Sequence, residues 1–221
     1  MKPILIVGAS GHSSVVIDII EKEGRHSIVG LVDKNMEIGS TLFGYPILGK
    51  EEEDLPALAA RHRIEGGLVA IGDNWVRAQV VQRIHAVCPE LEFVAAIHPQ
   101  SSIARGVSTG PGTVVMAGAI LNTNARVGAH CIVNTNASLD HDGVMRDYSS
   151  LAPGAVAGGN VTIGCYSAVS LGAHIVHRRC IGDHSIVGAG ATVLDDLPDY
   201  VVAYGTPARV IRSREQGDKY L

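Results

Sequence analysis

The chain has 221 residues, of which 46% are hydrophobic and only 4% aromatic, and its formal net charge is −4 at pH 7. This length suits one large or two small domains, and the composition predicts a core of aliphatic side chains and alanine. A slightly acidic chain without a basic run is a poor partner for nucleic acid, and no apolar stretch approaches the roughly 20 residues of a membrane span.

The cysteines and the N-terminus indicate a cytoplasmic protein. None of the four cysteines shows Cys-x-x-Cys spacing, so we expect free thiols at Cys88, Cys131, Cys165 and Cys180. The apolar run at residues 3–7 is too short for a signal peptide and leads directly into glycine.

The first 96 residues alternate between apolar runs and segments with helical spacing. Apolar runs predict four buried strands of a small, mostly parallel sheet, at residues 3–7, 28–33, 67–72 and 93–97. Helices are expected in the segment with Val15 and Ile20, up to about Gly24, from Glu51 to Arg63, and through the segment with Val76 and Val87. Residues 1–96 are therefore predicted to form an α/β domain.

A glycine-rich turn, residues 8–12, joins the first strand to the first helix. Free backbone N–H groups and the helix dipole can receive an anion there. Asp33 ends the second strand, where nucleotide-binding βαβ units place an acid. The spacing is not Gly-x-Gly-x-x-Gly, so a tight turn without a ligand remains an alternative.

A repeat of six residues dominates the second half of the chain. Every sixth position carries an aliphatic side chain or Met: Val127, Val133, Leu139, Met145, Leu151, Ala157, Ile163, Val169, Ile175, Ile181, Val187 and Val193. The residue four positions later is small in most repeats, with Val161 and Arg179 as exceptions. Such a repeat predicts a parallel β-helix with the aliphatic residues inside and the small ones at the corners.

The start and end of the β-helix are less regular in sequence. Ile97 and Ile103 are six apart, whereas Val114 and Ile120 fall in a shifted frame and Val127 shifts it once more. We therefore expect irregular early coils, or a loop near residues 110–112. The β-helix is assigned to residues 97–211 and a polar C-terminal tail to residues 212–221.

Six motifs spread over nearly the whole chain resemble one family of enzymes. They are residues 7–12 (Val-Gly-Ala-Ser-Gly-His), 69–74 (Val-Ala-Ile-Gly-Asp-Asn), 96–99 (Ala-Ile-His-Pro), Asn134-Thr135 with Asp140-His141-Asp142, 187–191 (Val-Gly-Ala-Gly-Ala) and 205–208 (Gly-Thr-Pro-Ala). The chain resembles the hexapeptide-repeat acyltransferases, which are left-handed parallel β-helices. It is most similar to bacterial sugar acetyltransferases with an N-terminal nucleotide-binding domain, including perosamine and bacillosamine N-acetyltransferases and relatives of sialic acid O-acetyltransferase.

The resemblance implies an acetyl-CoA-dependent N-acetyltransferase. Its substrate would be the 4-amino group of a nucleotide-linked 4-amino-4,6-dideoxy sugar, of the GDP-perosamine or UDP-bacillosamine precursor type. Two alternatives stay open: a sugar O-acetyltransferase of the sialic acid type, and a non-catalytic β-helix that binds a nucleotide sugar. The resemblance also implies a homotrimer with active sites between subunits, and no metal. A zinc site at His174, His177 and His184 lacks the usual His-x-x-x-x-His pair.

His141 is the candidate general base. It follows interior Leu139 by two residues, so it should lie on the surface of a coil. Imidazole suits proton abstraction near neutral pH, and the adjacent Asp142 carboxylate could hold its second nitrogen. The alternative from residue type alone is a surface histidine in an acidic loop. The resemblance implies the base role for His141 and the orienting role for Asp142, with Asn134 as a nearby polar partner.

The resemblance also implies two sets of binding residues. The nucleotide sugar would contact Gly8, Ser10, Gly11, His12, Asp33, Lys34, Gly72 and Asn74, although Asn74 could instead be a helix N-cap. Acetyl-CoA would lie along Asn134, Ser150, Gly159, Leu171, Ala189, Pro207 and Ala208, although the fold requires small corner residues in any case. Ser150 stands where the family often has histidine, and Ser13 stands where glycine is common.

Overall fold

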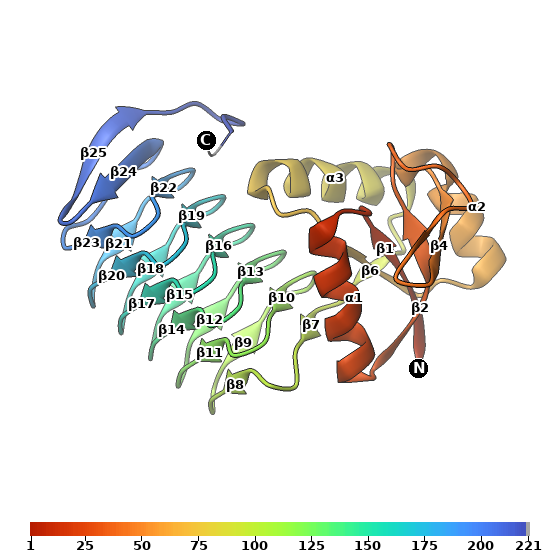
Figure 1. Cartoon of the computed structure of the whole chain (residues 1–221), viewed down its shortest axis with the longest axis horizontal. Coiled ribbons are helices and arrows are strands. Elements are labelled where there is room, and N and C mark those ends of the chain that lie inside the picture. Colours follow the sequence, from red (N-terminus) through yellow and green to blue (C-terminus); the bar gives the residue numbers. More distant parts are fainter. Residues whose placement is uncertain (220–221) are drawn as a thin grey trace. The chain divides into compact units, whose positions relative to one another are not determined.

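The computed structural model describes residues 1–219 and divides the chain after Pro99 into two compact units (Figure 1). The first unit is an α/β domain and the second is a parallel β-helix, so the predicted fold class is confirmed for both. Within residues 1–219, no helix combines the length and apolarity needed to cross a bilayer.

The first unit contains a six-stranded sheet in the order β3-β4-β2-β1-β5-β6. Its pairs are parallel except for the hairpin of β3 and β4. The elements are β1 (Lys2–Val7), α1 (Gly11–Glu23), β2 (His26–Val32), β3 (Thr41–Leu42), β4 (Tyr45–Gly49), α2 (Glu51–His62), β5 (Gly66–Val69), α3 (Asn74–Val87), β6 (Glu92–Phe93) and β7 (Ala96–Ile97).

The apolar run at the N-terminus forms the centre of this sheet. Ile4, Leu5, Ile6 and Val7 have no exposed surface, because β1 lies between β2 and β5 and is covered on both faces. The segment of residues 38–49, which is rich in turn residues, nevertheless supplies the strands β3 and β4. β4 pairs in parallel with β2 and so extends the sheet on that side.

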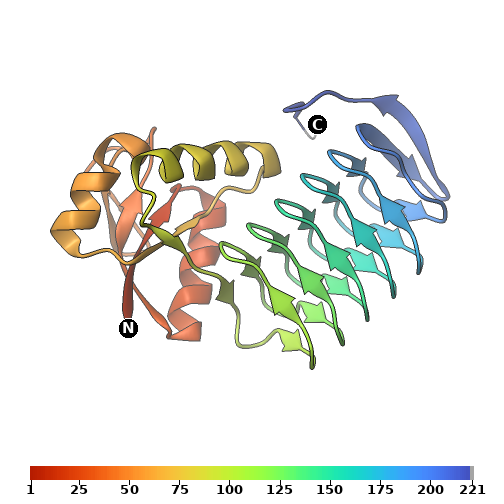
Figure 2. The same cartoon turned by 180° about the vertical axis from the view of Figure 1, so that it is seen from behind.

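The second unit is built from two-residue strands that recur every six residues. They are β8 (Ser102–Ile103), β9 (Ser108–Thr109), β10 (Val114–Val115), β11 (Ile120–Leu121), β12 (Arg126–Val127), β13 (Ile132–Val133), β14 (Ser138–Leu139), β15 (Val144–Met145), β16 (Ser150–Leu151), β17 (Val156–Ala157), β18 (Thr162–Ile163), β19 (Ala168–Val169), β20 (His174–Ile175), β21 (Cys180–Ile181), β22 (Ile186–Val187) and β23 (Thr192–Val193). From β8 to β20, each strand pairs in parallel with the strand three positions on, as Ser138 does with Val156. Three successive strands therefore complete one coil, and the β-helix has three faces (Figures 1 and 2).

The predicted interior positions are confirmed. All twelve residues of the repeat from Val127 to Val193 are at most 3% exposed. The small residues four positions later, such as Cys131 and Ala137, are also buried. Side chains of this size leave room for the backbone to approach the narrow interior at each corner.

The expected break in the repeat before Val127 is wrong. The second residue of each strand continues one frame through Thr109, Val115 and Leu121 to Val127. Val114 and Ile120, which suggested the shift, are instead the first residues of their strands, and Ile120 is 46% exposed. Every sixth residue from Gly106 to Gly190 has a positive φ, so residues 110–112 form an ordinary corner.

One edge of the β-helix carries bulky side chains at these positive-φ corners. His130, Tyr148, Tyr166, His184 and Tyr200 stack in succession, with ring centroids 4.5 to 5.3 Å apart. Non-glycine residues are disfavoured in the left-handed region, and stacking of this kind contributes about 0.5–1.5 kcal/mol per pair. The stack therefore offsets part of the backbone cost at these corners.

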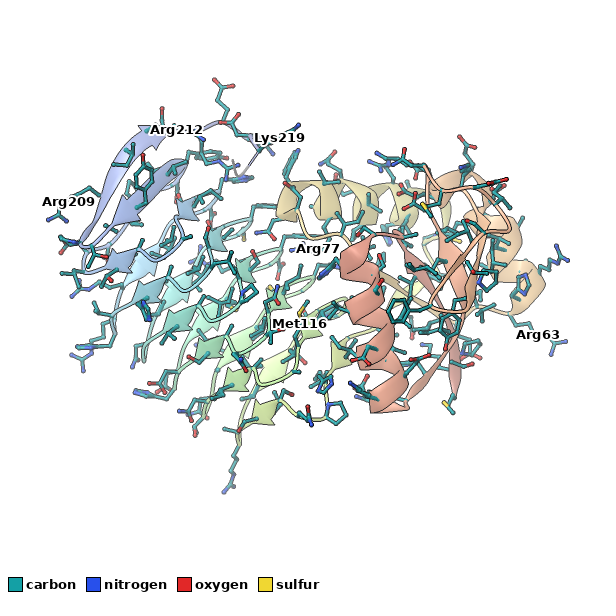
Figure 3. All side chains as sticks on the ribbon, viewed as in Figure 1. Arg63, Arg77, Met116, Arg209, Arg212 and Lys219 are labelled. Atoms are coloured by element: carbon teal, nitrogen blue, oxygen red, sulfur yellow. The ribbon has the colours of Figure 1, made fainter. Side chains whose placement is uncertain are left out.

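The C-terminal segment forms an antiparallel pair of strands. β24 (Val201–Gly205) continues the sheet from β22 and pairs with β25 (Ala208–Ser213), which runs beyond the predicted boundary at residue 211. Arg209 and Arg212 project from β25 (Figure 3). Arg214 is 7% exposed and its Nη1 donates to the backbone oxygen of His184, so the first residues of the expected tail pack on the last coils.

Candidate functional site

His141 lies at the corner that follows β14. Its side chain is 53% exposed, which confirms a position on the coil surface rather than in the interior. Nδ1 of the ring lies 2.9 Å from Oδ2 of Asp142. Asp142 can turn back on its neighbour because its backbone is left-handed, with φ 57°, a conformation that Asp tolerates better than most residues.

The contact between His141 and Asp142 changes the acidity of both groups. The hydrogen bond to Asp142 is the main cause that raises the pKa of His141, and the charge of Asp140 adds to it. The same hydrogen bond lowers the pKa of Asp142, with a further contribution from Asn124. A carboxylate accepts hydrogen bonds only, so the proton of a neutral ring lies on Nδ1 and Nε2 carries the free lone pair.

Two asparagines of the preceding coil hold the acids on either side of His141. Nδ2 of Asn122 donates to Asp140 Oδ1 at 2.7 Å, and Nδ2 of Asn124 donates to Asp142 Oδ1 at 3.3 Å. Asp140 Oδ1 also accepts from the backbone N–H of His141 at 2.7 Å. Neither asparagine was predicted from the sequence, although each precedes its partner by one full coil of 18 residues.

Gly159 occupies the equivalent corner of the next coil, directly against the imidazole. A Cβ at this position would lie 2.3 Å from Nε2 of His141 and 2.6 Å from Cε1. The family resemblance implied that Gly159 contacts acetyl-CoA. In this structure, the missing side chain makes room for the ring of His141.

A groove adjoins His141 on the face formed by β11, β14 and β17. Its volume is about 210 Å³, and it is lined by Ile120, Asn122, Ser138, Leu139, Asp140, Val156, Ala157 and Gly158. The outward side chains Ile120 and Val156 are 46% and 38% exposed. His141 is therefore beside a surface that offers both apolar contact and hydrogen-bonding groups.

The residues expected to bind acetyl-CoA fall on several parts of the β-helix. Leu171, which is 57% exposed, and Ala189 share one corner in successive coils, at the opposite edge of the face that His141 borders. Asn134 lies at the same corner two coils earlier, where its Oδ1 accepts from Thr135 N, so it does not partner His141 in the described residues. Pro207 is exposed in the turn between β24 and β25, whereas Ala208 is 7% exposed. Ser150 begins β16 on a neighbouring face.

A second pocket, of about 200 Å³, lies at the carboxyl ends of the strands in the α/β unit. Residues that follow four adjacent parallel strands line it: Gly8, Ala9 and Ser10 after β1; Asp33, Lys34 and Asn35 after β2; Glu51 after β4; and Ala70, Ile71 and Gly72 after β5, with Val76 and Val80 from α3. The chain continues from β1 to β2 on one side and reaches β5 on the other, so the pocket is at a topological switch point of the sheet. It collects five of the residues predicted to bind the nucleotide sugar: Gly8, Ser10, Asp33, Lys34 and Gly72.

The glycine turn of this pocket is held by hydrogen bonds to side chains. Oδ2 of Asp33 accepts from Ala9 N at 2.8 Å, and Oδ1 accepts from the backbone N–H groups of Asn35 and Met36. Gly8 has a φ of 100°, and a Cβ there would meet Ala70 O at 3.1 Å. Asp33 therefore shapes the pocket through the backbone.

Ser13 has a structural role that glycine could not fill. Its Oγ accepts from Ser10 N at 3.1 Å and donates to Ala70 O at 3.3 Å. The first turn of α1 is thereby tied to the end of β5. The departure from the family pattern at this position thus stabilises the glycine turn.

Three predicted nucleotide-sugar contacts lie outside the lining of this pocket. Asn74 is fully buried and its Oδ1 accepts from Arg77 Nη2 at 2.6 Å, while Asp73 rather than Asn74 caps α3. Burial, and secondly the charge of Arg77, lower the pKa of His12 to about 4. Gly11 opens α1 and an added Cβ would meet nothing within 4 Å. Asn74 thus has no exposed surface and fixes the position of Arg77.

The remaining histidines do not form a metal centre in the described part of the chain. No group of three His, Cys, Asp or Glu side chains suited to a metal ion occurs within residues 1–219. His174 and His177 are exposed, whereas His184 belongs to the aromatic stack.

Comparisons with known proteins give matches for both units. Residues 3–84 match the family described as the PglD N-terminal domain. A UDP-N-acetylbacillosamine N-acetyltransferase of Bacillus subtilis (strain 168) is 36% identical over 120 residues. That match spans 53% of this chain and 52% of the relative, so about half the length of the curated relative is covered.

Solved structures match over almost the whole chain. One is a histidine-to-alanine mutant of the GDP-perosamine N-acetyltransferase of Caulobacter crescentus, in complex with CoA and GDP-perosamine. It is 31% identical with a TM-score of 0.89, covering 96% of this chain and 98% of that one. Another is the acetyltransferase domain of PglB from Neisseria gonorrhoeae in complex with acetyl coenzyme A. It is 29% identical with a TM-score of 0.86, covering 95% of this chain and 99% of that one.

Proposed function

The chain belongs to the family of left-handed β-helix acetyltransferases that act on nucleotide-linked amino sugars, and from that premise we propose its reaction and the residues that perform it. The enzyme transfers the acetyl group of acetyl-CoA to the 4-amino group of a nucleotide-linked 4-amino-4,6-dideoxy sugar. The observation that carries the mechanism is the hydrogen bond between His141 and Asp142, which leaves Nε2 of the ring available as a base.

In the proposed mechanism His141 removes a proton from the attacking amine. The amine nitrogen forms a bond to the thioester carbonyl carbon while Nε2 takes one of its protons. Asp142 stabilises the imidazolium that results and keeps the ring in orientation. The C–S bond then breaks, and the imidazolium returns the proton to the departing CoA sulfur, so that the products are the acetamido sugar and free CoA.

The acceptor is assigned to the pocket of the α/β unit. Its glycine turn, Gly8 to Ser10, precedes α1 and offers backbone N–H groups near the positive end of the helix dipole. A diphosphate is the part of a nucleotide sugar that suits this turn. The solved relative from Caulobacter crescentus is described in complex with GDP-perosamine, which supports this class of acceptor.

Acetyl-CoA is assigned to the β-helix near His141. The groove beside the base exposes apolar side chains such as Ile120 and Val156, which suit the pantetheine arm. Leu171 and Ala189 border the same face at its other edge, and Ser150 lies across that corner, which is compatible with a donor site completed by a neighbouring subunit. We propose a homotrimer in the cytoplasm with three such sites.

The proposed reaction is tested with purified protein, acetyl-CoA and a panel of acceptors. Release of CoA thiol is followed with 4-amino-4,6-dideoxy sugars linked to GDP, UDP or dTDP, and with the matching 4-hydroxy sugars. Acetylation of an amino acceptor supports the proposal, whereas acetylation of the hydroxy acceptors alone would assign an O-acetyltransferase. Nucleotide-sugar binding without any transfer would indicate a non-catalytic protein.

The assembly is tested by sedimentation at the enzyme concentration used for the assay. A trimer is expected, because the apolar side chains at the face bordered by His141 would then be covered and the donor site completed. A fully active monomer would contradict a site shared between subunits.

A further inference from the structure

The pocket of the α/β unit contains a buried carboxylate that the proposed reaction does not use. Glu51 is the first residue of α2, directly after β4, and its side chain is only 6% exposed. Oε2 lies 3.3 Å from Nη2 of Arg83. Oε1 has no hydrogen-bond partner within residues 1–219, and it keeps some contact with solvent. This oxygen therefore opens to the pocket that Glu51 lines.

The position of Glu51 in the sheet matches the base of a nucleotide whose diphosphate lies at the glycine turn. The turn follows β1, Asp33 follows β2, and Glu51 follows β4, and these strands are consecutive neighbours. Two strand spacings separate the turn from Glu51, which is about 10 Å. That is the scale on which a ribose separates a diphosphate from its base.

The environment of Glu51 favours a ligand that donates hydrogen bonds. Burial is the main cause that raises its pKa, and the charge of Glu52 adds to it, while Arg83 and Lys34 oppose the change. The carboxylate has thus lost solvation that Arg83 does not fully replace. An N–H donor entering the pocket would supply hydrogen bonds to a charged acceptor, which are stronger than those between neutral groups.

Guanine, uracil, thymine and adenine differ in the hydrogen-bonding groups that they present to such a carboxylate. Guanine offers two adjacent donors, N1–H and N2–H, which match the two lone-pair directions of a carboxylate edge. Uracil and thymine offer one N–H between two carbonyl oxygens, which the carboxylate repels. Adenine offers its amino group next to an acceptor nitrogen, so it lacks the second adjacent donor that guanine has.

We propose that Glu51 reads the base of the nucleotide and selects guanine, so that the acceptor is a GDP-linked amino sugar. The inference rests on the proposed function for the identity of the sugar substrate. Recognition of the base itself concerns binding only and does not depend on the transfer reaction. Glu51 is a specificity residue that touches the substrate far from the reacting amine.

The alternative is that Glu51 only links α2 to α3 through its ion pair with Arg83. Glu52 provides the matched control, because it also forms an ion pair with Arg83 but does not line the pocket. If the contact with Arg83 were the whole role of these acids, Glu51→Gln and Glu52→Gln would have similar effects. A role in base recognition affects only Glu51→Gln.

The test is calorimetric titration of the full chain with GDP, UDP, dTDP and ADP, in the absence of any sugar or acetyl-CoA. The unchanged protein is expected to bind GDP at least tenfold more tightly than the other three. Glu51→Gln should weaken GDP binding about tenfold or more, the discrimination that a good bidentate contact to a base provides. UDP binding should stay the same or improve, since an amide can both donate to a carbonyl and accept from N3–H, and Glu52→Gln should bind GDP as the unchanged protein does.

Two results would overturn the inference: UDP, dTDP or ADP binding as tightly as GDP, or an unchanged affinity for GDP in a folded Glu51→Gln protein. A thermal unfolding midpoint for each variant shows whether it is folded. Selective GDP binding in a protein that transfers no acetyl group would instead contradict the proposed function and leave the base assignment intact. Acetyl transfer to a UDP- or dTDP-linked sugar with no GDP selectivity would support the proposed function and contradict the base assignment.

Discussion

Nε2 of His141 lies against the backbone of Gly159, one coil further along the β-helix, where a Cβ would approach it to 2.3 Å. The candidate base is therefore held from two sides. Asp142 fixes the ring through Nδ1, and the absence of a side chain at residue 159 leaves the space that the other ring nitrogen occupies. This contact arises because the two residues occupy equivalent corners of successive coils, which the pairing of β14 with β17 stacks on each other.

Gly159→Ala is expected to lower kcat about 10- to 100-fold with little loss of stability. The new methyl group would displace the imidazole, and a misplaced base loses much of the 100- to 10,000-fold that proton transfer contributes. Steady-state kinetics and the thermal unfolding midpoint measure the two effects separately. In a His141→Ala background the same substitution should change kcat by less than twofold, because no ring is left to displace; a further large loss there would show that Gly159 acts on the donor instead.

His141→Asn is expected to lower kcat about 100- to 10,000-fold at neutral pH. The deficit should shrink as the pH rises, because a larger fraction of the acceptor amine is then unprotonated and needs less assistance. His177→Asn is the matched control, since His177 is an exposed histidine two coils further on at the equivalent corner. Equal losses in the two variants would remove His141 from the mechanism.

Asp142→Asn is expected to move the acidic limb of the kcat/KM profile to lower pH. The hydrogen bond that His141 donates to Asp142 raises the pKa of His141, and His141 acts as a base only when neutral, so removing the carboxylate lowers the pH at which activity appears. The maximal rate should nevertheless fall about tenfold or more, because the imidazolium loses its stabilising charge. Asn tolerates the left-handed backbone at this corner, so the fold should be kept.

The control for that measurement is Asp140→Asn. Asp140 influences the ring through its charge and does not bond to it, so its removal should shift the limb less than Asp142→Asn does. A larger shift for Asp140→Asn than for Asp142→Asn would show that Asp140, and not Asp142, is the acid that governs His141.

His12 is expected to make stability depend on pH between about 6.5 and 4. Burial and Arg77 lower its pKa to about 4 in the folded chain, so the unfolded chain binds the proton more readily in this range. The contribution of neutral His12 to the free energy of unfolding is complete above pH 6.5 and is lost as the pH falls towards 4. At 1.36 kcal/mol per pKa unit, the loss is up to about 3 kcal/mol. Urea unfolding of the unchanged protein and of His12→Gln at pH 7 and pH 4.5 checks this difference.

In the His12→Gln protein, the free energy of unfolding should fall less between the two pH values than in the unchanged protein. His85→Gln, at an exposed position on α3, should behave like the unchanged protein. Parallel pH dependence in all three proteins would show that other groups govern the acid sensitivity.

The sequence by itself determined the interior of the β-helix and the general position of the pocket in the α/β unit. A six-residue period shows which side chain of each short strand faces inward, because that choice is local and repeats at every corner. The repeat was nevertheless misread before Val127, since Val114 and Ile120 are as apolar as the interior residues that follow them. The glycine turn and Asp33 were also recognisable, because strand ends and helix starts depend on neighbouring residues.

Only the tertiary structure decided which side chains surround these groups. Asn122, Asn124 and Gly159 reach the acids and the ring of His141 because three strands complete a coil, and a contact between successive coils leaves no local pattern. Glu51 lines the pocket of the α/β unit because β4, which lies in a segment rich in turn residues, adds to the sheet beside β2. Strand order depends on the packing of the whole domain, and a period read along the chain therefore cannot supply it.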